Sequence, residues 1–491
     1  MSFSLSAGAS PQRRFRPKIA HPRRVFNDRA LCYCKSLCGS KSPTADMVNK
    51  AGALVSLALI LLGGPGLAAQ DEAGAPESLP FSFETYMLRN GLRIILSEDP
   101  RLPLVTVAVG YGAGTLREKP GQEGLAFLLE NLMFQGSENV PPLQHVAYVQ
   151  KVGGELNATT SADKALFYET LPSNQLSLAL WLESDRMKSL AITPLAIEQT
   201  RDDLLREHRE RVATDPYFET FIQFEELLFP DPSYGHPMIG PGMDDLSEAE
   251  ILAFHRAHYV PNNAVLCIVG NIDVARTRGL VARYFESIAP GPDVPPLPGP
   301  EFTRESDAVV RSAQVSGGSA GFHMGFRFFP LQPGDRECLR ILAYVLFEGE
   351  TSRLKHRLLR RDLTARYVTG SLDERPGVSA LKIFCFATNA IMVARSERAI
   401  LSEIDRLKAN EVSPDELRRA RRRFRKDYLD RLATNLGKAR FLVEAAFAGT
   451  GLDALDRDLG TVLAVTPQNL AAFASKYFVP QNRVVLEFGP R

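Results

Sequence analysis

The chain has 491 residues, of which 45% are hydrophobic and 23% charged, a composition typical of a globular protein with two or more domains. Its 58 basic and 57 acidic residues leave a formal charge of +1, so charge gives no reason to expect nucleic acid as a partner. Three of the six cysteines lie in the N-terminal leader. The other three, Cys267, Cys338 and Cys385, are expected to be buried thiols rather than a disulfide framework.

The N-terminal segment has the pattern of a targeting sequence. Lys50 precedes a short apolar run at 51–62, and small residues follow that run, as in a secretory signal peptide. A transmembrane helix needs about 20 apolar residues, so the run is too short to span a membrane comfortably. Met47 stands where such a signal begins. We therefore interpret 47–69 as the signal peptide and 1–46 as a doubtful or disordered leader.

This pattern predicts export to the periplasm or the extracellular space, with no integral membrane segment after the signal is cleaved. The alternative is an organelle matrix, because residues 1–44 are rich in Arg and Ser and contain a single acid, Asp28. The apolar core of the signal favours export.

The first half of the mature chain alternates predicted strands and helices. The Asn90–Gly91 pair predicts a hairpin turn, and Pro194 directly after Thr193 predicts a capped helix start. The predicted elements are a hairpin at Tyr86–Leu96, a buried strand at Leu104–Gly110, and helices at Gln122–Phe134, Leu176–Leu190 and Pro194–Val212.

A proline-rich stretch separates this half from a second one. We predict a semi-rigid linker at 290–302 between a domain at 70–289 and a domain at 303–491, because so many prolines exclude a helix or an inner strand. In the second domain, helices are predicted at Leu339–Phe347, Ser352–Leu363 and Ser396–Lys408.

The two halves end in similar sequences. His258–Gly270 and Tyr477–Gly489 match over a helix end, a Pro-Asn or Pro-Gln turn and a β-branched strand, 219 positions apart. Ser247 and Thr466, each a plausible helix N-cap, match in the same register. A repeat of this length predicts two homologous domains rather than a solenoid, whose periods are about 20–50 residues. The expected fold class is α+β, with a sheet and helices in each domain.

Four stretches of the chain carry motifs: Leu88–Leu96, Tyr111–Phe134, Val152–Thr160 and Tyr234–Gly240. Together they resemble the pitrilysin (insulinase) family of zinc peptidases, and the resemblance covers about residues 80–491. It implies two homologous pitrilysin-like domains, as in processing peptidases, in a clamshell arrangement.

In that family an inverted zinc motif, H-x-x-E-H, lies on the helix after a Gly-Leu-Ala turn. Its two histidines bind zinc and its Glu is the general base for the attacking water. The matching positions here are Phe127, Glu130 and Asn131, and the third ligand, a Glu of a later helix, matches Glu207. A catalytic zinc site needs about three protein ligands, and this chain keeps one. The resemblance therefore implies no metal in this chain, a vestigial base position at Glu130, and zinc in a partner subunit.

Two further regions match peptide-contacting segments of the family. Arg360 and Tyr367 match an Arg and a Tyr that contact the bound peptide and its scissile carbonyl, and both side chains are suitable donors to a carbonyl or oxyanion. Asn157, Ala158 and Thr159 match a strand edge that pairs with an extended peptide through main-chain hydrogen bonds. From the sequence alone, an alternative stays open for each region. Arg360 is then one of several solvated arginines and Tyr367 an ordinary strand residue, and Asn157, Ala158 and Thr159 belong to an ordinary hairpin.

A lost zinc site beside retained substrate contacts predicts the non-catalytic subunit of an exported zinc metallopeptidase. The expected partners are a zinc-bearing homologue of the family and peptide substrates, and the chain alone is expected to be inactive. One alternative is a homodimeric peptide-binding or scaffold protein without catalysis. A second alternative is a hydrolase that uses an unusual metal.

Overall fold

The computed structural model describes residues 79–239, 241–297, 299–301, 309–315, 318–409, 412–448 and 451–490. The predicted leader, 1–46, and the predicted signal peptide, 47–69, lie outside these residues. Within the described ranges, no helix combines the length and the apolar character that crossing a membrane requires.

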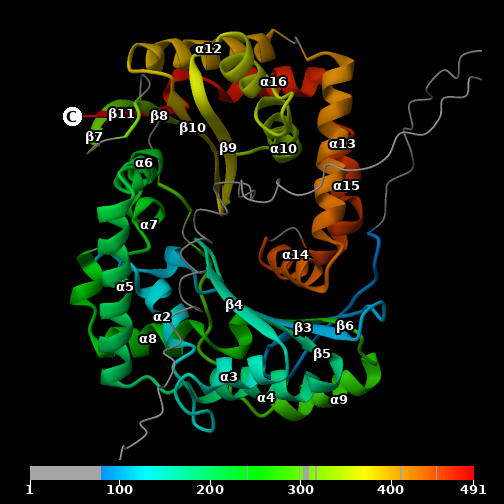
Figure 1. Ribbon diagram of the computed structural model, residues 1–491. Helices are drawn as coiled ribbons and strands as arrows, with labels where there is room; N and C mark the ends of the chain where they lie inside the picture. The colour runs from blue at the N-terminus through cyan, green and yellow to red at the C-terminus, as the bar shows by residue number, and fades with distance from the viewer. Residues whose placement is uncertain are drawn as a thin grey trace, which may run out of the picture. The chain divides into compact units, whose positions relative to one another are not determined.

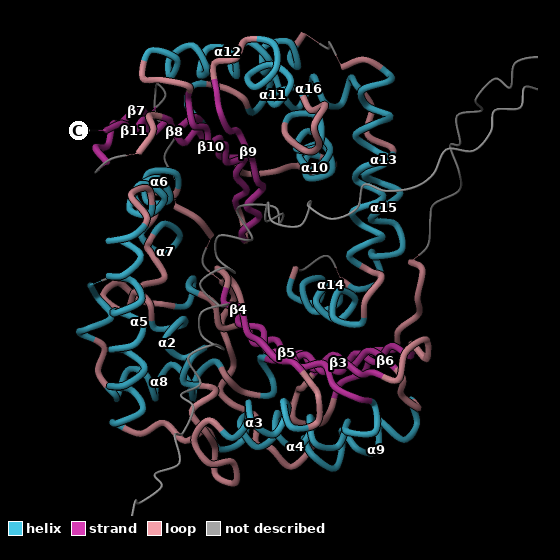
Figure 2. Tube along the Cα trace, in the orientation of Figure 1, coloured by secondary structure: helices cyan, strands magenta, loops and turns pink. Residues whose placement is uncertain are grey.

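The first half of the chain forms a mixed six-stranded sheet (Figure 2). Its strands lie in the order β1-β2-β6-β3-β5-β4, and of the neighbouring pairs only β2 and β6 run parallel. The predicted hairpin at Asn90–Gly91 is confirmed, because β1 and β2 pair antiparallel on either side of it. The strands are β1 (Glu84–Met87), β2 (Arg93–Glu98), β3 (Leu104–Tyr111), β4 (Glu155–Thr160), β5 (Ala165–Pro172) and β6 (Ala264–Gly270).

The second half forms a five-stranded sheet with a matching topology. The order is β7-β11-β8-β10-β9, with β7 and β11 parallel and the other neighbours antiparallel. This order repeats β2-β6-β3-β5-β4, so the two homologous sheet-plus-helices domains predicted from the repeat are confirmed. The clamshell arrangement stays a prediction. The strands are β7 (Val309–Val315), β8 (Gly321–Phe328), β9 (Ala365–Arg375), β10 (Val378–Ala387) and β11 (Arg483–Pro490).

Helices cover the faces of both sheets (Figure 1). The first half contributes α2 (Leu125–Leu132), α3 (Gln144–Lys151), α4 (Leu176–Ser189), α5 (Pro194–Thr214), α6 (Phe218–Leu228), α7 (Pro232–Gly235), α8 (Glu248–His258) and α9 (Val274–Phe285). The second half contributes α10 (Asp335–Leu346), α11 (Arg353–Lys355), α12 (Ile391–Lys408), α13 (Pro414–Arg431), α14 (Asn435–Phe447), α15 (Leu455–Leu463) and α16 (Pro467–Tyr477).

Three helix N-caps predicted from the sequence are confirmed by hydrogen bonds in the structure. Thr193 accepts a hydrogen bond from the backbone N–H of Ala196 at the start of α5. Ser247 and Thr466 both form capping boxes, at α8 and α16 respectively, so the repeated segments keep the same local structure.

Four predicted helices differ in extent from the structure by three residues or more, and one of them, expected at Leu339–Phe347, begins earlier, at Asp335. The helix expected at Gln122–Phe134 begins only at Leu125, after Gly124, whose φ of 94° is not helical. The helix expected at Ser396–Lys408 begins earlier, at Ile391.

The helix expected at Ser352–Leu363 is replaced by the short α11 and a π-helix at His356–Arg361. In this wider turn Arg357 reaches the carboxylates of both Asp362 (2.6 Å) and Glu403 (3.2 Å), which explains why the tertiary contacts override a regular α-helix.

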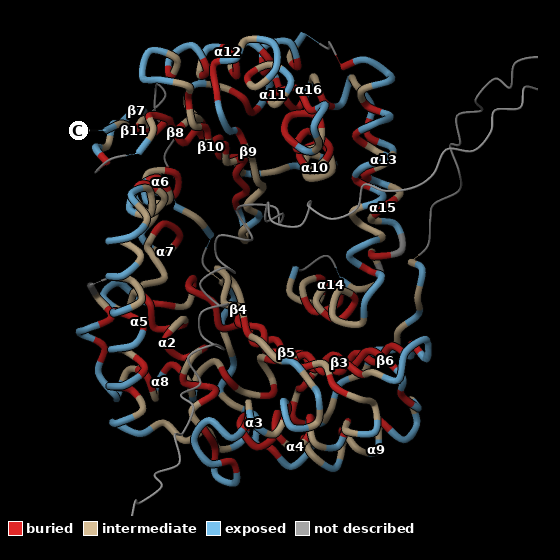
Figure 3. Tube along the Cα trace, in the orientation of Figure 1, coloured by how far each residue is buried: buried red, intermediate tan, exposed pale blue. Residues whose placement is uncertain are grey.

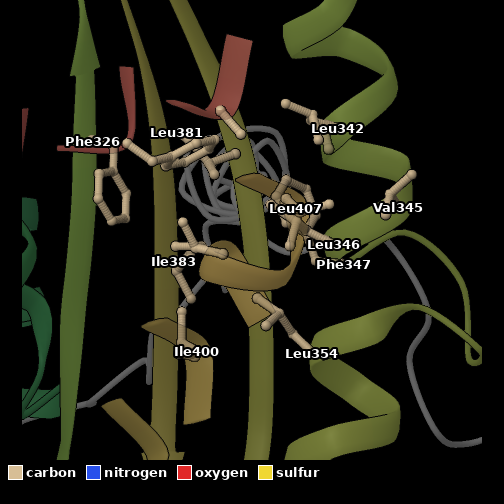
Figure 4. Close-up of a cluster of buried hydrophobic side chains, with 14 of the residues drawn as sticks. Phe326, Leu342, Val345, Leu346, Phe347, Leu354, Leu381, Ile383, Ile400 and Leu407 are labelled. Atoms are coloured by element: carbon tan, nitrogen blue, oxygen red, sulfur yellow. The ribbon is translucent and has the colours of Figure 1, made fainter. Parts of the chain in front are cut away.

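The inner strands β3, β6 and β8 are buried along nearly their whole length, whereas α5 and α13 bury only a narrow stripe (Figure 3). In the second half, Leu381 and Ile383 of the sheet meet Leu342 and Leu346 of α10 and Leu407 of α12 in a continuous apolar core (Figure 4). The predicted buried thiols are confirmed: the three cysteines that the structure describes are free and buried.

Each sheet has one face covered by a helix of the other half. Helix α14, from the second half, packs on β3 and β6 of the first sheet, where Leu442 and Val443 join the core of Ala108 and Cys267. Helix α6, from the first half, packs on β8 and β11 of the second sheet. We call α6 and α14 the exchanged helices. Because each completes the other half's core, the two halves are interlocked.

Glycines in equivalent strands make room for the exchanged helices. A Cβ atom on Gly110 of β3 would lie 2.5 Å from Val443 Cγ1, and one on Gly325 of β8 would lie 2.6 Å from a methyl group of Leu228. Distances this short require the contacted side chains, or the helices that carry them, to shift. The exchanged helices therefore sit closer to the sheets than any side chain at these positions would permit.

We expect Gly110→Ala to lower the free energy of unfolding by about 1–3 kcal/mol, because overpacking displaces α14. The matched control is Gly279→Ala in α9, where nothing lies within 4 Å of the added methyl group. The control is expected to be neutral or stabilising, since alanine favours helices. Urea unfolding of both variants measures the difference, and equal effects would contradict the close approach of α14.

Buried ion pairs anchor both exchanged helices. Lys438 of α14 contacts Asp99, which follows β2, with an Nζ–Oδ2 distance of 2.6 Å, and both side chains are buried. Glu225 of α6 contacts Lys382 at 2.7 Å and Arg375 at 2.6 Å, both on the second sheet. Each exchanged helix is thus held by charge as well as by apolar contact.

Candidate functional site

Helix α2 carries the positions that match the zinc motif. Of its eight residues, only Phe127 and Asn131 are not buried, so these two positions form the single accessible face of the helix. The helix start is fixed by the Glu118 carboxylate, which accepts hydrogen bonds from the backbone N–H groups of Gly124 (2.9 Å) and Ala126 (2.7 Å). Burial raises the pKa of Glu118 to about 8, despite these hydrogen bonds.

The residues on this accessible face do not fit a zinc ion. Phe127 offers a ring that packs on the first-half core, and the side-chain amide of Asn131 donates to the backbone oxygen of Phe127 at 2.9 Å. Glu207 lies on α5, which packs directly against α2. One carboxylate beside a phenyl ring and a neutral amide is not the donor set of a catalytic zinc site.

Glu130 is buried on α2, one turn after Phe127. The pKa of the nearby Tyr259 phenol is raised well above its usual value. Burial is the largest cause, and the charge of Glu130 is the next, followed by Tyr111 and Glu118. The rings of Tyr111 and Tyr259 contact each other with centroids 5.0 Å apart and planes tilted by 37°. The catalytic-base position is therefore retained within a buried cluster of phenols and carboxyl groups.

Restoring the motif tests whether this geometry is that of a degenerate zinc site. The double variant Phe127→His and Asn131→His is expected to bind about one zinc ion per chain, with Glu207 as the third ligand. Both replaced side chains are only partly buried, so the cost in stability is expected to be small. Metal analysis of purified protein measures the gain. The matched control adds Glu207→Gln and is expected to lose the zinc; zinc retained in that control would exclude Glu207 as a ligand.

The residues Asn157, Ala158 and Thr159 lie on β4, the edge strand of the first sheet. They pair on one side with Tyr168, Phe167 and Leu166 of β5, and the sheet ends at β4 on the other side. The side-chain oxygen of Asn157 accepts from the backbone N–H of Ala158 at 2.9 Å. An edge strand with outward backbone groups is the geometry that β-augmentation requires, and their role as a peptide site stays a prediction.

Arg360 and Tyr367 lie in the second half, close to its edge strand. Arg360 lies in the last part of the π-helical turn, is largely exposed, and donates to Glu350 at 3.1 Å. Tyr367 on β9 is 38% exposed, and its ring lies against Phe384 and Phe386 with centroid distances of 6.3 Å. The structure therefore presents both donors at an accessible edge of the second sheet, whereas α2 and β4 belong to the first half.

One group of side chains in the first half was not predicted from the sequence. His145, Glu169, Glu183 and Arg186 meet in the interior beneath β4. The available signal was Glu183 and Arg186 at i, i+3 in a predicted amphipathic helix, a spacing that favours a pair on one face.

Two family profiles match this chain in succession. The profile described as Insulinase (Peptidase family M16) matches residues 93–227, and the profile described as Peptidase M16 inactive domain matches residues 245–424. Together they span more than half of the chain.

Two proteins illustrate the similarity in sequence. Zinc protease PqqE from Helicobacter pylori is 24% identical over 394 residues, which cover 78% of this chain and 86% of that protein. Mitochondrial-processing peptidase subunit beta from Blastocladiella emersonii is 28% identical over 228 residues, which cover 46% of this chain and 48% of that protein.

Solved structures share the fold. A protease from Helicobacter pylori superposes with a TM-score of 0.78 at 21% identity, covering 84% of this chain and 100% of that one. The peptidase M16 inactive domain from Pseudomonas fluorescens has a TM-score of 0.75 at 17% identity, covering 84% and 98%. The two successive profile matches, over a duplicated fold that these structures share, show that the chain belongs to the insulinase family of peptidases, family M16.

Proposed function

We propose that this chain is the non-catalytic subunit of an exported M16 zinc metallopeptidase and that it contributes peptide binding to a zinc-bearing partner. The observation that carries the proposal is the accessible face of α2, where Phe127 and Asn131 stand at the positions of the zinc-binding histidines. This loss is combined with an open β4 edge and exposed donors at Arg360 and Tyr367.

The names of similar proteins support a peptidase assembly outside the cytoplasm. The relatives include proteins named as zinc proteases, and one solved neighbour is the periplasmic protease PqqL from Escherichia coli (TM-score 0.68, 17% identity, covering 84% of this chain and 48% of that one). The signal-peptide pattern at 47–69 agrees with export.

In such an assembly this chain would hold the peptide and leave the metal chemistry to the partner. The edge of β4 would add the substrate as an extra strand, which gives affinity with little sequence preference. Arg360 and Tyr367 would donate hydrogen bonds to the peptide at the partner's site. The Arg360–Glu350 ion pair is exposed, so the guanidinium can leave Glu350 and bind the peptide at little cost in free energy.

The test is co-purification of this chain with an M16 homologue that has the intact H-x-x-E-H motif. We expect a stable complex in which zinc and peptidase activity depend on the partner's motif, while this chain alone cleaves no peptide. A chain that is active by itself, with a bound metal of its own, would contradict the proposal and support the unusual-metal alternative.

The open β4 edge also supports the second candidate, a homodimeric peptide-binding or scaffold protein. The two are separated by sedimentation of the purified chain with and without the homologue. A homodimer that persists in the presence of the homologue and binds peptide would favour the scaffold function.

A further inference from the structure

Four ionisable side chains with no part in the proposed function meet inside the first half. His145 lies on the first turn of α3, Glu169 in the middle of β5, and Glu183 and Arg186 on α4. None of them is more than 3% exposed. Such deep burial of four polar side chains requires that their charges balance.

Arg186 and Glu183 balance each other. The guanidinium donates from Nε and Nη2 to both carboxylate oxygens at 2.6–3.0 Å, and it lies over the Phe167 ring at 4.4 Å. Burial raises the pKa of Glu183, and Arg186 opposes that shift, so the pair is best described as a closed, buried ion pair.

The other two side chains of the cluster, Glu169 and His145, face each other. His145 Nε2 lies 3.4 Å from Glu169 Oε2. Within the described part of the chain, neither oxygen of Glu169 has a hydrogen-bond partner. A charged Glu169 would add an uncompensated negative charge beside Phe134 and Phe167. A proton on the Glu169 carboxyl group removes that charge.

The surroundings favour the neutral form of both groups. Burial raises the pKa of Glu169 to about 8, although Arg186 opposes the shift, and burial together with Arg186 lowers the pKa of His145 to about 3. The ionisable groups that face the cluster from other elements are the phenols of Tyr111 on β3 and Tyr259 after α8, and burial raises the pKa of both.

This cluster lies directly behind the edge strand. Glu169 pairs in register with Leu156 of β4, next to the candidate peptide edge. The helix that carries His145 leads into β4 through Val152, Gly153 and Gly154, so α3 and β4 are consecutive elements of the chain. The protonation state of Glu169 therefore acts on the strand that would hold the peptide.

We propose that His145, Glu169, Glu183 and Arg186 form a proton-binding centre that regulates the β4 edge: the folded chain keeps a proton on Glu169 near neutral pH, and its loss at higher pH loosens α3 and β4. The effect on peptide binding rests on the proposed function. The proton itself does not, because it is a property of the chain alone.

The direction of the pH dependence follows from the raised pKa. The ordinary value of 4.5 for a glutamate applies to the unfolded chain, so between 4.5 and about 8 the folded chain binds more protons than the unfolded chain. The stability that Glu169 contributes is fully present below pH 4.5, falls as the pH rises further, and is lost above about pH 8. His145 acts in the opposite direction, but only between about 3 and its ordinary value of 6.5.

A bound divalent cation is the competing explanation for the cluster. One ligand atom from each of His145, Glu169 and Glu183 can be chosen so that all lie within 4.8 Å of one another. However, the Arg186 guanidinium already supplies the positive charge next to Glu183 and would repel a cation. The charge balance therefore favours a proton.

The experiment compares the wild-type chain with Glu169→Gln, a neutral isostere, by hydrogen–deuterium exchange of α3 and β4 from pH 6 to pH 9. We expect the ratio of wild-type to variant opening constants to rise about tenfold per pH unit up to about pH 8 and then to level off. Taking the ratio cancels the intrinsic pH dependence of exchange and the titration of other groups such as Glu118. Glu155→Gln, on the exposed start of β4, is the matched control and should show no such rise.

Binding of fluorescein-labelled β-casein supplies the second measurement. The wild-type chain is expected to lose affinity between pH 6 and pH 8.5, whereas Glu169→Gln should keep it. A pH-dependent exchange ratio without casein binding would leave the proton centre standing and count against the peptide-binding function. A flat exchange ratio, or a stoichiometric metal that disappears in His145→Ala, would overturn the proton centre. If Glu169→Gln does not fold, Glu169→Leu replaces it.

Discussion

Replacing Lys382 with methionine is expected to lower the free energy of unfolding by about 3 kcal/mol, because it leaves Glu225 and Asp373 to share one guanidinium in a mostly buried site. All four side chains of this network are at most 21% exposed. Burial alone would lower the pKa of Lys382, yet the carboxylates of Asp373 and Glu225 keep it raised, so the ammonium group is firmly charged.

Urea unfolding measures this loss, and two further variants make it specific. The exposed ion pair of Lys426 and Asp430 on α13 supplies the control, Lys426→Met, which is expected to change stability little. Adding Glu225→Gln to Lys382→Met should recover part of the loss, because the remaining pair of Arg375 and Asp373 is balanced. If Lys382→Met and Lys426→Met behave alike, the ion-pair network does not anchor α6.

The same network predicts sensitivity to acid. Burial would raise the pKa of Asp373, but Lys382 and Arg375 outweigh it and hold the pKa below its usual range. A lowered pKa contributes stability above the unfolded value that is lost as pH falls through the folded value. In Lys382→Met the pKa of Asp373 rises, so the loss in acid should begin at a higher pH than in the wild type.

Arg360→Ala is expected to lower kcat of the complex with a zinc-bearing homologue by about a hundredfold, since removal of one preorganised donor to a developing oxyanion has about this effect. Its zinc content should not change, because the zinc of the proposed complex is held by the partner's motif and Arg360 lies at an exposed position of this chain's second half. Tyr367→Phe, which keeps the ring contacts with Phe384 and Phe386 and removes only the hydroxyl, should show a smaller loss of the same kind.

The neighbouring residue provides the matched control. Arg361 is also about half exposed and contacts Asp362 at 2.9 Å, so Arg361→Ala removes an equal charge from the same turn. We expect this variant to keep near-normal kcat. Equal losses in Arg360→Ala and Arg361→Ala would indicate a general charge effect, and unchanged activity in Arg360→Ala would remove its substrate role.

Local chemistry made much of the fold predictable from the sequence. The Asn90–Gly91 hairpin and the capping boxes at Ser247 and Thr466 depend on residues within a few positions of each other, and all three are confirmed. The repeat that ends at Gly270 and Gly489 likewise predicted two equivalent sheets. The fixed spacing of the zinc motif predicted Phe127 and Asn131 as its degenerate positions, and the structure places both residues on the accessible face of α2.

The remaining features depend on contacts that no local pattern encodes. The apolar stripes of α6 and α14 show that each helix covers a sheet, but not which sheet, because both sheets present similar faces. His145 and Glu169 become partners only when α3 folds against β5. The π-helical turn that contains Arg360 forms because Arg357 contacts the carboxylates of Asp362, directly after the turn, and of Glu403 on α12. These are tertiary effects that override local preference.

The exchanged helices bear on how the two-domain chain arose and on what should happen when the linker between its halves is cleaved. A one-domain unit with this helix would leave one sheet face bare, and a second copy would cover it, so the arrangement is the one expected of a swapped dimer whose two copies were joined into one chain. For the same reason, a cut in the stretch 290–302 should yield two fragments that are insoluble apart and that assemble only when they are made together. The smallest unit expected to fold is therefore the pair of halves.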